Sequence, residues 1–153
     1  MTSYQHNVDA KKIQGAIESE LAAMVTDIAS LVAGAKTKDG VTGIAAVLNK
    51  KQGTPTSRSN PGEPPYKQTG NLGRSWKTRK RGKKVGKRIV AIAGSDQDYA
   101  RFLEFGTARM RPRPYVAAGI DLARPKIRKR IQMARKGVMR ELKKVLRPVR
   151  PSR

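Results

Sequence analysis

Two long amphipathic repeats, one near each end of the chain, constrain its fold more than any other feature. Between Asp9 and Val32, apolar residues recur every three or four positions, at Ile13, Ile17, Leu21, Met24, Ile28 and Leu31. This spacing predicts one face of a helix that Asp9 caps and Gly34 ends. A second such repeat, with Lys and Arg on its other faces, runs from Pro125 to Pro148, through Ile127, Ile131, Ala134, Val138, Leu142 and Val145.

The middle of the chain predicts a β-hairpin. Ile89, Val90 and Ile92 form a β-branched run that ends at Gly94. The basic stretch 77–87 precedes this run and contains two glycines suited to turns and irregular strands. We therefore expect residues 77–87 to supply the first strand and the turn, and the β-branched run to supply the second strand.

Short helices are expected around this hairpin. One contains Ile44, Val47 and Leu48, and another is capped by Thr69 and reaches Trp76. A third, capped by Asp98, ends at Gly106, and its aromatic residues Phe102 and Phe105 are expected to pack it against the hairpin. Pro114 suits the first position of the next helix.

Two polar or proline-rich segments separate these elements. Residues 49–60 are rich in Ser, Thr, Lys and Gly and predict an exposed, mobile loop. The PGEPPY segment at 61–66 is expected to be extended, because consecutive prolines disfavour helix. The fold class that follows is α+β, with long N- and C-terminal amphipathic helices packed around a small antiparallel β-sheet with a short central helix.

A chain of 153 residues is expected to form one domain, 1–153, with a basic tail at about 147–153. Hydrophobic residues make up 37% and aromatic residues 5% of the chain, so its core is thin. A small sheet can hardly cover two long amphipathic helices. The composition therefore favours self-association.

The net charge of +23 favours polyanionic partners or acidic protein surfaces. The charge is uneven: residues 74–88 hold nine Lys or Arg and no acid, and residues 107–153 hold sixteen against two acids. No helix-turn-helix, zinc-finger or aromatic RNA-binding signature accompanies it, which disfavours sequence-specific reading. A free, sequence-independent nucleic-acid-binding protein remains an alternative.

Several chemistries are disfavoured by what the sequence lacks. With no cysteine and a single histidine, no metal ligand set is evident, and we expect no cofactor. A nuclease needs clustered carboxylates, whereas Asp96, Asp98 and Glu104 are spread along the chain. No apolar stretch is long enough for a membrane span. The chain is therefore expected to be neither an enzyme nor a membrane protein, and no catalytic, cofactor-binding or metal residues are proposed.

Two stretches carry a family resemblance. PGEPPYKQTGNLGRSW (61–76) and YARFLEFGTARMRPRPYVAAGI (99–120) resemble the gene-product-ten family of lambdoid long-tailed phages, described as neck, head-tail joining or tail-completion proteins. The first motif is Pro-Gly-x-Pro-Pro, then Thr-Gly-x-Leu and a serine. The second is Tyr-Ala, then Glu-Phe-Gly-Thr, then a proline followed by an aromatic residue. Their order across a basic hairpin makes the pair more specific than either motif alone.

This resemblance implies a structural protein of the virion, made in the host cytoplasm and located at the neck where head meets tail. It implies a homo-oligomeric ring, of six copies or alternatively twelve, through which DNA passes. The implied neighbours are head-closure, tail-terminator or tail-tube proteins. Contact with DNA would be non-specific.

Two candidate surfaces follow. Glu104 is a single acid among arginines, which favours ion pairing with Arg109, Arg111 or Arg113 within the subunit or across to a neighbour. The predicted subunit or partner interface is Glu104, Phe105, Arg109, Arg111, Arg113, Tyr115 and Trp76. The predicted DNA-facing residues are the cations of the hairpin: Lys77, Arg79, Lys80, Arg81, Lys83, Lys84, Lys87 and Arg88.

Overall fold

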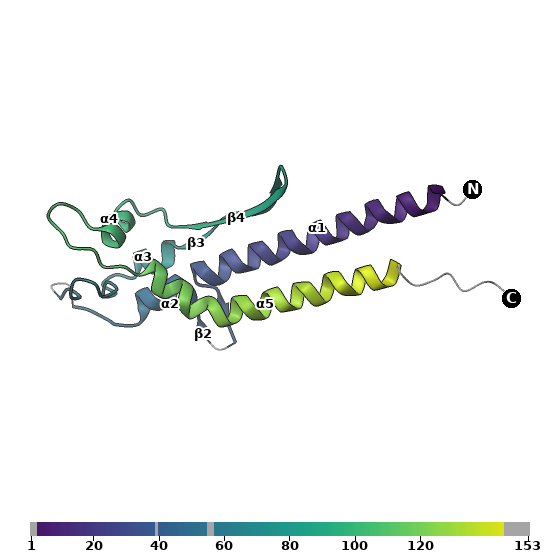
Figure 1. Ribbon diagram of the computed structural model, residues 1–153. Helices are drawn as coiled ribbons and strands as arrows, with labels where there is room; N and C mark the ends of the chain where they lie inside the picture. The colour runs from purple at the N-terminus through teal and green to yellow at the C-terminus, as the bar shows by residue number, and fades with distance from the viewer. Residues whose placement is uncertain (1–2, 39, 55–56, 146–153) are drawn as a thin grey trace.

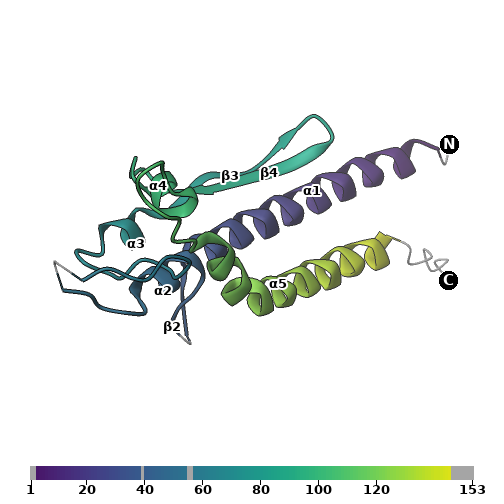
Figure 2. The ribbon, with the colours of Figure 1, turned by 60° about the vertical axis from the view of Figure 1, so that its left-hand side comes forward.

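Two long helices define the shape of the molecule. The computed structural model describes residues 3–38, 40–54 and 57–145, and Figure 1 shows helices α1 (Ser3–Ala33) and α5 (Val116–Val145) side by side. They extend from a head of short helices and loops at one end. The β3–β4 hairpin lies along α1 on the side away from α5 (Figures 1 and 2). The predicted α+β class with two long terminal helices is confirmed.

Helix α1 ends as the sequence predicts but begins earlier. Gly34 follows it with φ 131°, and the N–H groups of Gly34 and Ala35 both donate to the carbonyl of Ser30. Asp9 was expected to cap the helix and instead lies within it. The helix continues upstream to Ser3, because residues 3–8 contain no glycine or proline to interrupt it.

The predicted hairpin is confirmed, with strand β3 at Lys77–Val85 and strand β4 at Arg88–Gly94. Gly86 adopts φ 58° in the turn. The hairpin is fastened to α1, because the backbone N–H of Gly82 donates to Thr26 Oγ1 (2.7 Å). A Cβ on Gly82 would lie 2.2 Å from the carbonyl oxygen of Ala22 in α1. Only a glycine therefore permits the strand to approach the helix this closely.

Helix α5 is longer than its sequence pattern indicates. Pro125 was expected to open the helix, but it lies inside a helix that begins at Val116. Figure 2 shows α5 changing direction in its first third, which is the bend that an internal proline causes. Helix α5 packs on α1 and on α2, and its buried small residues Ala123 and Ala134 lie on one side of the helix. Pro114 precedes α5 by two residues.

The head is built from three short helices, α2 (Gly43–Asn49), α3 (Asn71–Ser75) and α4 (Ala100–Phe105). Its core is a single cluster: Ile44, Leu48, Leu72, Ala100 and Tyr115. Two of the predicted helix caps differ from what the structure shows. Asp98 makes no capping bond to α4, whose N-cap is Tyr99, and Thr69 Oγ1 accepts only a long bond from Asn71 N (3.4 Å). A pair of two-residue strands, β1 (Lys36–Thr37) and β2 (Gly40–Val41), joins α1 to α2.

The described part of the predicted loop at 49–60 makes backbone hydrogen bonds and buried contacts that its polar composition does not predict. Gly53 N donates to Lys67 O (2.9 Å), Lys67 N donates to Lys51 O (2.8 Å), and Ser59 is buried. The next residues are not extended throughout, because Pro61 and Gly62 form a turn in which Glu63 N donates to Asn60 O (3.1 Å). The predicted basic tail at 147–153 lies outside the described residues.

Candidate subunit interface and basic surfaces

The corner that follows α4 is fixed by a glycine. Gly106 adopts φ 78°, and its N–H donates to Phe102 O (2.9 Å). A Cβ at this position would lie 2.7 Å from Met110 O and 2.9 Å from Pro112 N. The chain then turns back through paired bonds between Thr107 and Met110. The predicted role of Gly106 as the end of the helix is therefore confirmed, and close packing adds a second reason for a glycine here.

Glu104 has a different role within the subunit from the one the sequence suggests. Its Oε2 atom accepts hydrogen bonds from the backbone N–H groups of Tyr115 (2.8 Å) and Val116 (3.1 Å), at the start of α5. A carboxylate is favourable there, because the first N–H groups of a helix lack partners within the helix. Within the part of the chain that the structure describes, Glu104 pairs with none of the three arginines that follow it. It joins α4 to α5.

Tyr115 and Trp76 also lie inside the subunit. Tyr115 is 1% exposed, and its hydroxyl donates to Ala100 O (3.1 Å). Trp76 is half-buried and meets Tyr115 edge to face, with the ring centroids 6.1 Å apart. Burial raises the pKa of Tyr115 to about 12. The expectation that Tyr115 contacts a neighbour is therefore corrected, because its side chain fills the core of its own subunit.

The remaining predicted interface residues are Phe105 and the three arginines that follow it in the sequence. Phe105 is 80% exposed, and Phe102 is 40% exposed with the guanidinium of Arg101 4.7 Å from its ring centre. These phenylalanines were expected to pack α4 against the hairpin, but Ala100 and Leu103 supply its buried face instead. Beyond the corner, Arg109 and Arg111 are exposed and Arg113 is half-buried. The corner after α4 therefore exposes the aromatic side chain of Phe105, and exposed cations follow it in the chain.

An apolar groove of about 790 Å³ lies on another part of the head. Its lining includes Ala46 and Val47 of α2, Tyr66 after the proline segment, and Leu122 of α5. Glu63, Asp121, Lys50 and Lys51 also line it, so both signs of charge are present. Figures 1 and 2 place α2 and α4 apart on the head. No local pattern in the sequence predicts this groove, because it is formed by three separate segments.

The predicted DNA-facing cations of the hairpin are only partly free. Asp96 pairs with Lys77 (3.3 Å) and with Arg79 (3.0 Å), and Glu18 of α1 pairs with Lys84 (2.5 Å). The hydrogen bond from Lys77 is the main cause that lowers the pKa of Asp96, and the bond from Lys84 lowers that of Glu18. The side chain of Lys80 lies outside those that the structure describes. The remaining four are exposed: Arg81, Lys83, Lys87 and Arg88.

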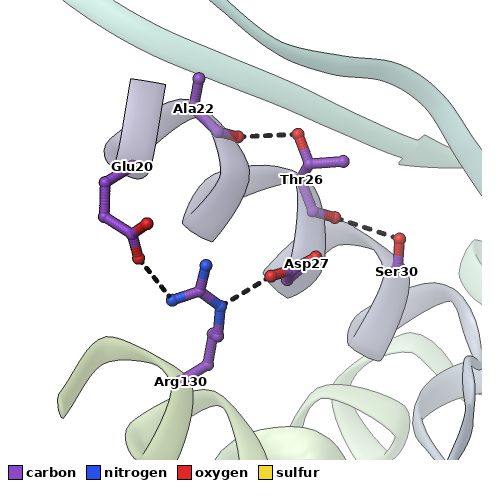
Figure 3. A network of polar contacts seen from close by, with 6 residues as sticks. All are labelled: Glu20, Ala22, Thr26, Asp27, Ser30 and Arg130. Atoms are coloured by element: carbon purple, nitrogen blue, oxygen red, sulfur yellow. Dashed lines mark hydrogen bonds and ion pairs between the residues drawn. The ribbon is translucent and has the colours of Figure 1, made fainter. Parts of the chain in front are cut away.

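One ionic cluster that sequence reasoning missed fastens α5 to α1. Arg130 of α5 donates to Glu20 (3.1 Å) and to Asp27 (2.6 Å), both of α1, as Figure 3 shows. The same figure shows Thr26 on the side of α1 that faces the hairpin. The available signal was the seven-residue spacing of Glu20 and Asp27, which places two acids on one face of a helix. The sequence offers no signal for which cation they meet.

The described residues offer neither a metal site nor a membrane span. Within residues 3–38, 40–54 and 57–145, no three His, Asp or Glu side chains gather as metal ligands would. None of the helices there combines the length and apolarity needed to cross a bilayer. Of the dispersed acids Asp96, Asp98 and Glu104, Asp96 takes part in ion pairs and Glu104 caps a helix.

Comparison with known proteins places this architecture. Residues 10–106 match the family model described as "Bacteriophage HK97-gp10, putative tail-component". The chain belongs to this family. The match runs from α1 through α4 to Gly106, so it contains the hairpin and the whole of the first resembling motif. No curated protein and no solved structure matches the chain.

Family membership confirms the coarser part of what the resemblance implies. The protein is a structural tail component of a bacteriophage and hence part of the virion. Helix α5, most of the arginine-rich corner and the remainder of the C-terminal region lie beyond the matched residues.

Proposed function

We propose that this tail component assembles into a closed ring at the head-tail interface, as a neck or tail-completion protein, and that DNA passes through the ring. Six copies are the first choice and twelve the alternative, since a ring must match the rotational symmetry of its neighbours. Its partners in the virion are the adjoining head-closure, tail-terminator or tail-tube proteins. Family membership supports the location, and the exposed Phe105 carries the argument for assembly.

The end of the subunit that contains α2, α3 and α4 presents two different apolar surfaces, which is what a ring requires. A closed ring uses a heterologous contact, in which one surface of a subunit meets a different surface of the next. Phe105 projects from the α4 corner, whereas the apolar groove is lined by α2 and α5. We propose that Phe105 of one copy enters the groove of its neighbour. Burying an exposed phenylalanine in this way is worth about 2 kcal/mol per contact.

The charges around the two surfaces are compatible with this contact. Arg109 and Arg111 follow Phe105 and are exposed. Glu63 and Asp121 line the groove and offer carboxylates to these arginines, although Lys50 and Lys51 share the groove. Arginine-carboxylate pairs at the rim of an interface contribute specificity more than affinity. The apolar insertion therefore supplies the stability of the contact and the arginines its orientation.

Sizing with light scattering at high salt, followed by electron microscopy, tests this proposal. We expect the wild-type chain to form rings, and Phe105→Ser to reduce them to monomers without changing the urea midpoint of the isolated subunit. Val85→Ser is the matched control, because Val85 is an exposed apolar residue at the hairpin turn, away from both surfaces. A strict monomer at high concentration, even with neighbouring neck proteins, would overturn the ring. If Phe105→Ser still formed rings, the proposal that Phe105 enters the groove of the neighbouring copy would be wrong.

The same measurement distinguishes the proposed ring from the alternative function. A free, sequence-independent nucleic-acid-binding protein shares the net charge of +23 but has no need of a ring. Its mark would be salt-sensitive DNA binding by monomers. The exposed Phe105 and the family match favour the ring.

A further inference from the structure

The outward face of α5 carries a row of exposed cations that have no role in the packing of the subunit. We propose that this face is the DNA-binding surface of the protein, in place of the hairpin that the sequence suggests. The inference rests on the proposed function in one respect, because it takes DNA in the ring to be the polyanion that is bound. Ring formation does not depend on which surface binds the DNA.

The row lies opposite the side of α5 that packs on α1. Ala123 and Ala134 are fully buried and mark the packed side. At 100° per residue, the exposed cations lie on the other half of the helix: Arg128, Lys129, Arg135, Lys136, Arg140 and Lys143. At a rise of 1.5 Å per residue they span roughly 22 Å, or about one cation every 4 Å. They spread over about 140° of the helix circumference, and a cationic face of this width can contact several phosphates of a nucleic-acid backbone.

These cations have no carboxylate partner in the described part of the chain, unlike three of the eight predicted cations of the hairpin. Among the residues that the structure describes, none of the six has a carboxylate within ion-pair distance. Arg124, one turn before them, pairs with Asp121. On the hairpin, by contrast, Asp96 and Glu18 neutralise three of the predicted cations. A cation that already has a carboxylate partner gains less from a phosphate, because it must give up that partner.

The chemistry of the row favours a nucleic acid over an acidic protein. Protein interfaces are depleted of lysine and of charge at their centre, and are enriched in aromatic residues, methionine and arginine. On this side of α5 three of the six cations are lysines, and the exposed apolar residues Leu122, Met133 and Met139 include no aromatic side chain. Phosphate recognition needs only positive side chains that can reach a repeating backbone charge. Binding is therefore expected to be non-specific and strongly dependent on salt.

Because of how the elements are arranged, the hairpin and α5 cannot both face the DNA in a ring. The hairpin and α5 pack on different sides of α1, so their outward faces point away from each other (Figures 1 and 2). In a ring, one of these faces can line the central passage while the other points outward. Among the side chains that the structure describes, the α5 face has six unpaired cations and the hairpin four, so we assign the DNA to α5.

Two variants of equal charge distinguish the surfaces. The first replaces four residues of α5 with glutamine: R128Q, K129Q, R135Q and K136Q. The matched control replaces the four exposed hairpin cations: R81Q, K83Q, K87Q and R88Q. Glutamine keeps helix propensity, and circular dichroism verifies that both variants are folded. Binding of a mixed-sequence 30-base-pair duplex is followed by fluorescence anisotropy between 50 and 300 mM NaCl.

We expect the α5 variant to lose roughly 100-fold or more in affinity at 50 mM NaCl, and its salt slope to fall by about 3 to 4. The hairpin variant should stay within about threefold of wild type. Equal losses in both variants, or a larger loss in the hairpin variant, would overturn the inference. So would poly-glutamate of matched charge binding α5 as tightly as the duplex, because the surface would then suit acidic proteins. Light scattering on the same samples reports ring formation separately, so either proposal can fail alone.

Discussion

Removing the carboxylate of Glu104 tests whether this side chain holds the start of α5 in place. In Glu104→Ala, the N–H groups of Tyr115 and Val116 lose an acceptor at 2.8 and 3.1 Å. Hydrogen bonds to a charged acceptor, combined with a helix-capping role, give an expected loss of about 2 kcal/mol in the free energy of unfolding. With a typical urea dependence of about 2 kcal/mol per molar, the midpoint should fall by about 1 M.

Glu104→Gln separates the hydrogen bonds from the charge. The amide oxygen can still accept from a backbone N–H, but the favourable interaction of a carboxylate with the helix N-terminus is lost. We expect a smaller loss, about 0.5–1 kcal/mol. The chain has one tryptophan, and Trp76 contacts Tyr115, so tryptophan fluorescence in urea reports on this corner directly.

Arg109→Gln is the control, because Arg109 is exposed and close to Glu104 in sequence. It should leave the urea midpoint of the subunit unchanged. A Glu104→Ala chain that unfolds at the wild-type midpoint would refute the capping role. If Glu104→Gln also kept wild-type stability but failed to form rings, the carboxylate would act between subunits instead.

Three further substitutions test other parts of the structure. Gly106→Val places a β-branched residue at φ 78° with its Cβ 2.7 Å from Met110 O, so thermal denaturation should show a loss of about 3 kcal/mol or more, whether or not rings form. Because burial raises the pKa of Tyr115 to about 12, the unfolded chain releases this proton first. Stability should therefore fall as pH rises above 10, and urea titrations should show wild type losing roughly 2 kcal/mol more than Tyr115→Phe by pH 11.5. Arg130→Gln breaks a partly exposed bridge to two carboxylates of α1 and should cost about 1 kcal/mol by urea denaturation, less at high salt.

The elements that sequence predicts well are those fixed by local rules. Periodicity locates both long helices, and glycines locate the ends of α1 and α4. Alternation and β-branching locate β4. The misplaced start of α5 shows the limit of this reasoning. Pro125 suits the start of a helix. Here the residues before it are helical as well, because Gly119 packs closely on Ile44 of α2 and Glu104 caps the first turn, so the helix continues past the proline with a bend.

In the candidate site, too, some features could be predicted from the sequence and others could not. The exposure of Arg109 and Arg111 could be predicted, because both are charged residues in an arginine-rich segment. The burial of Tyr115 does not, because its position depends on Trp76 and Ala100, which come from distant parts of the chain. Phe105 presents the opposite case: an apolar residue on a predicted core helix proves to be exposed, because six residues of α4 offer only one narrow buried face.

The acids of α1 explain where the net charge of +23 is concentrated. Glu18 pairs with the hairpin through Lys84, whereas Glu20 and Asp27 pair with α5 through Arg130. Each of these acids lies where α1 contacts another element, so it neutralises a cation beside a packed surface and leaves those farther out unpaired. Because α1 lies between the hairpin and α5, the uncompensated charge is divided between two surfaces that face apart. A total charge read from the sequence cannot reveal this division, and so the assignment of DNA to α5 depends on the structure.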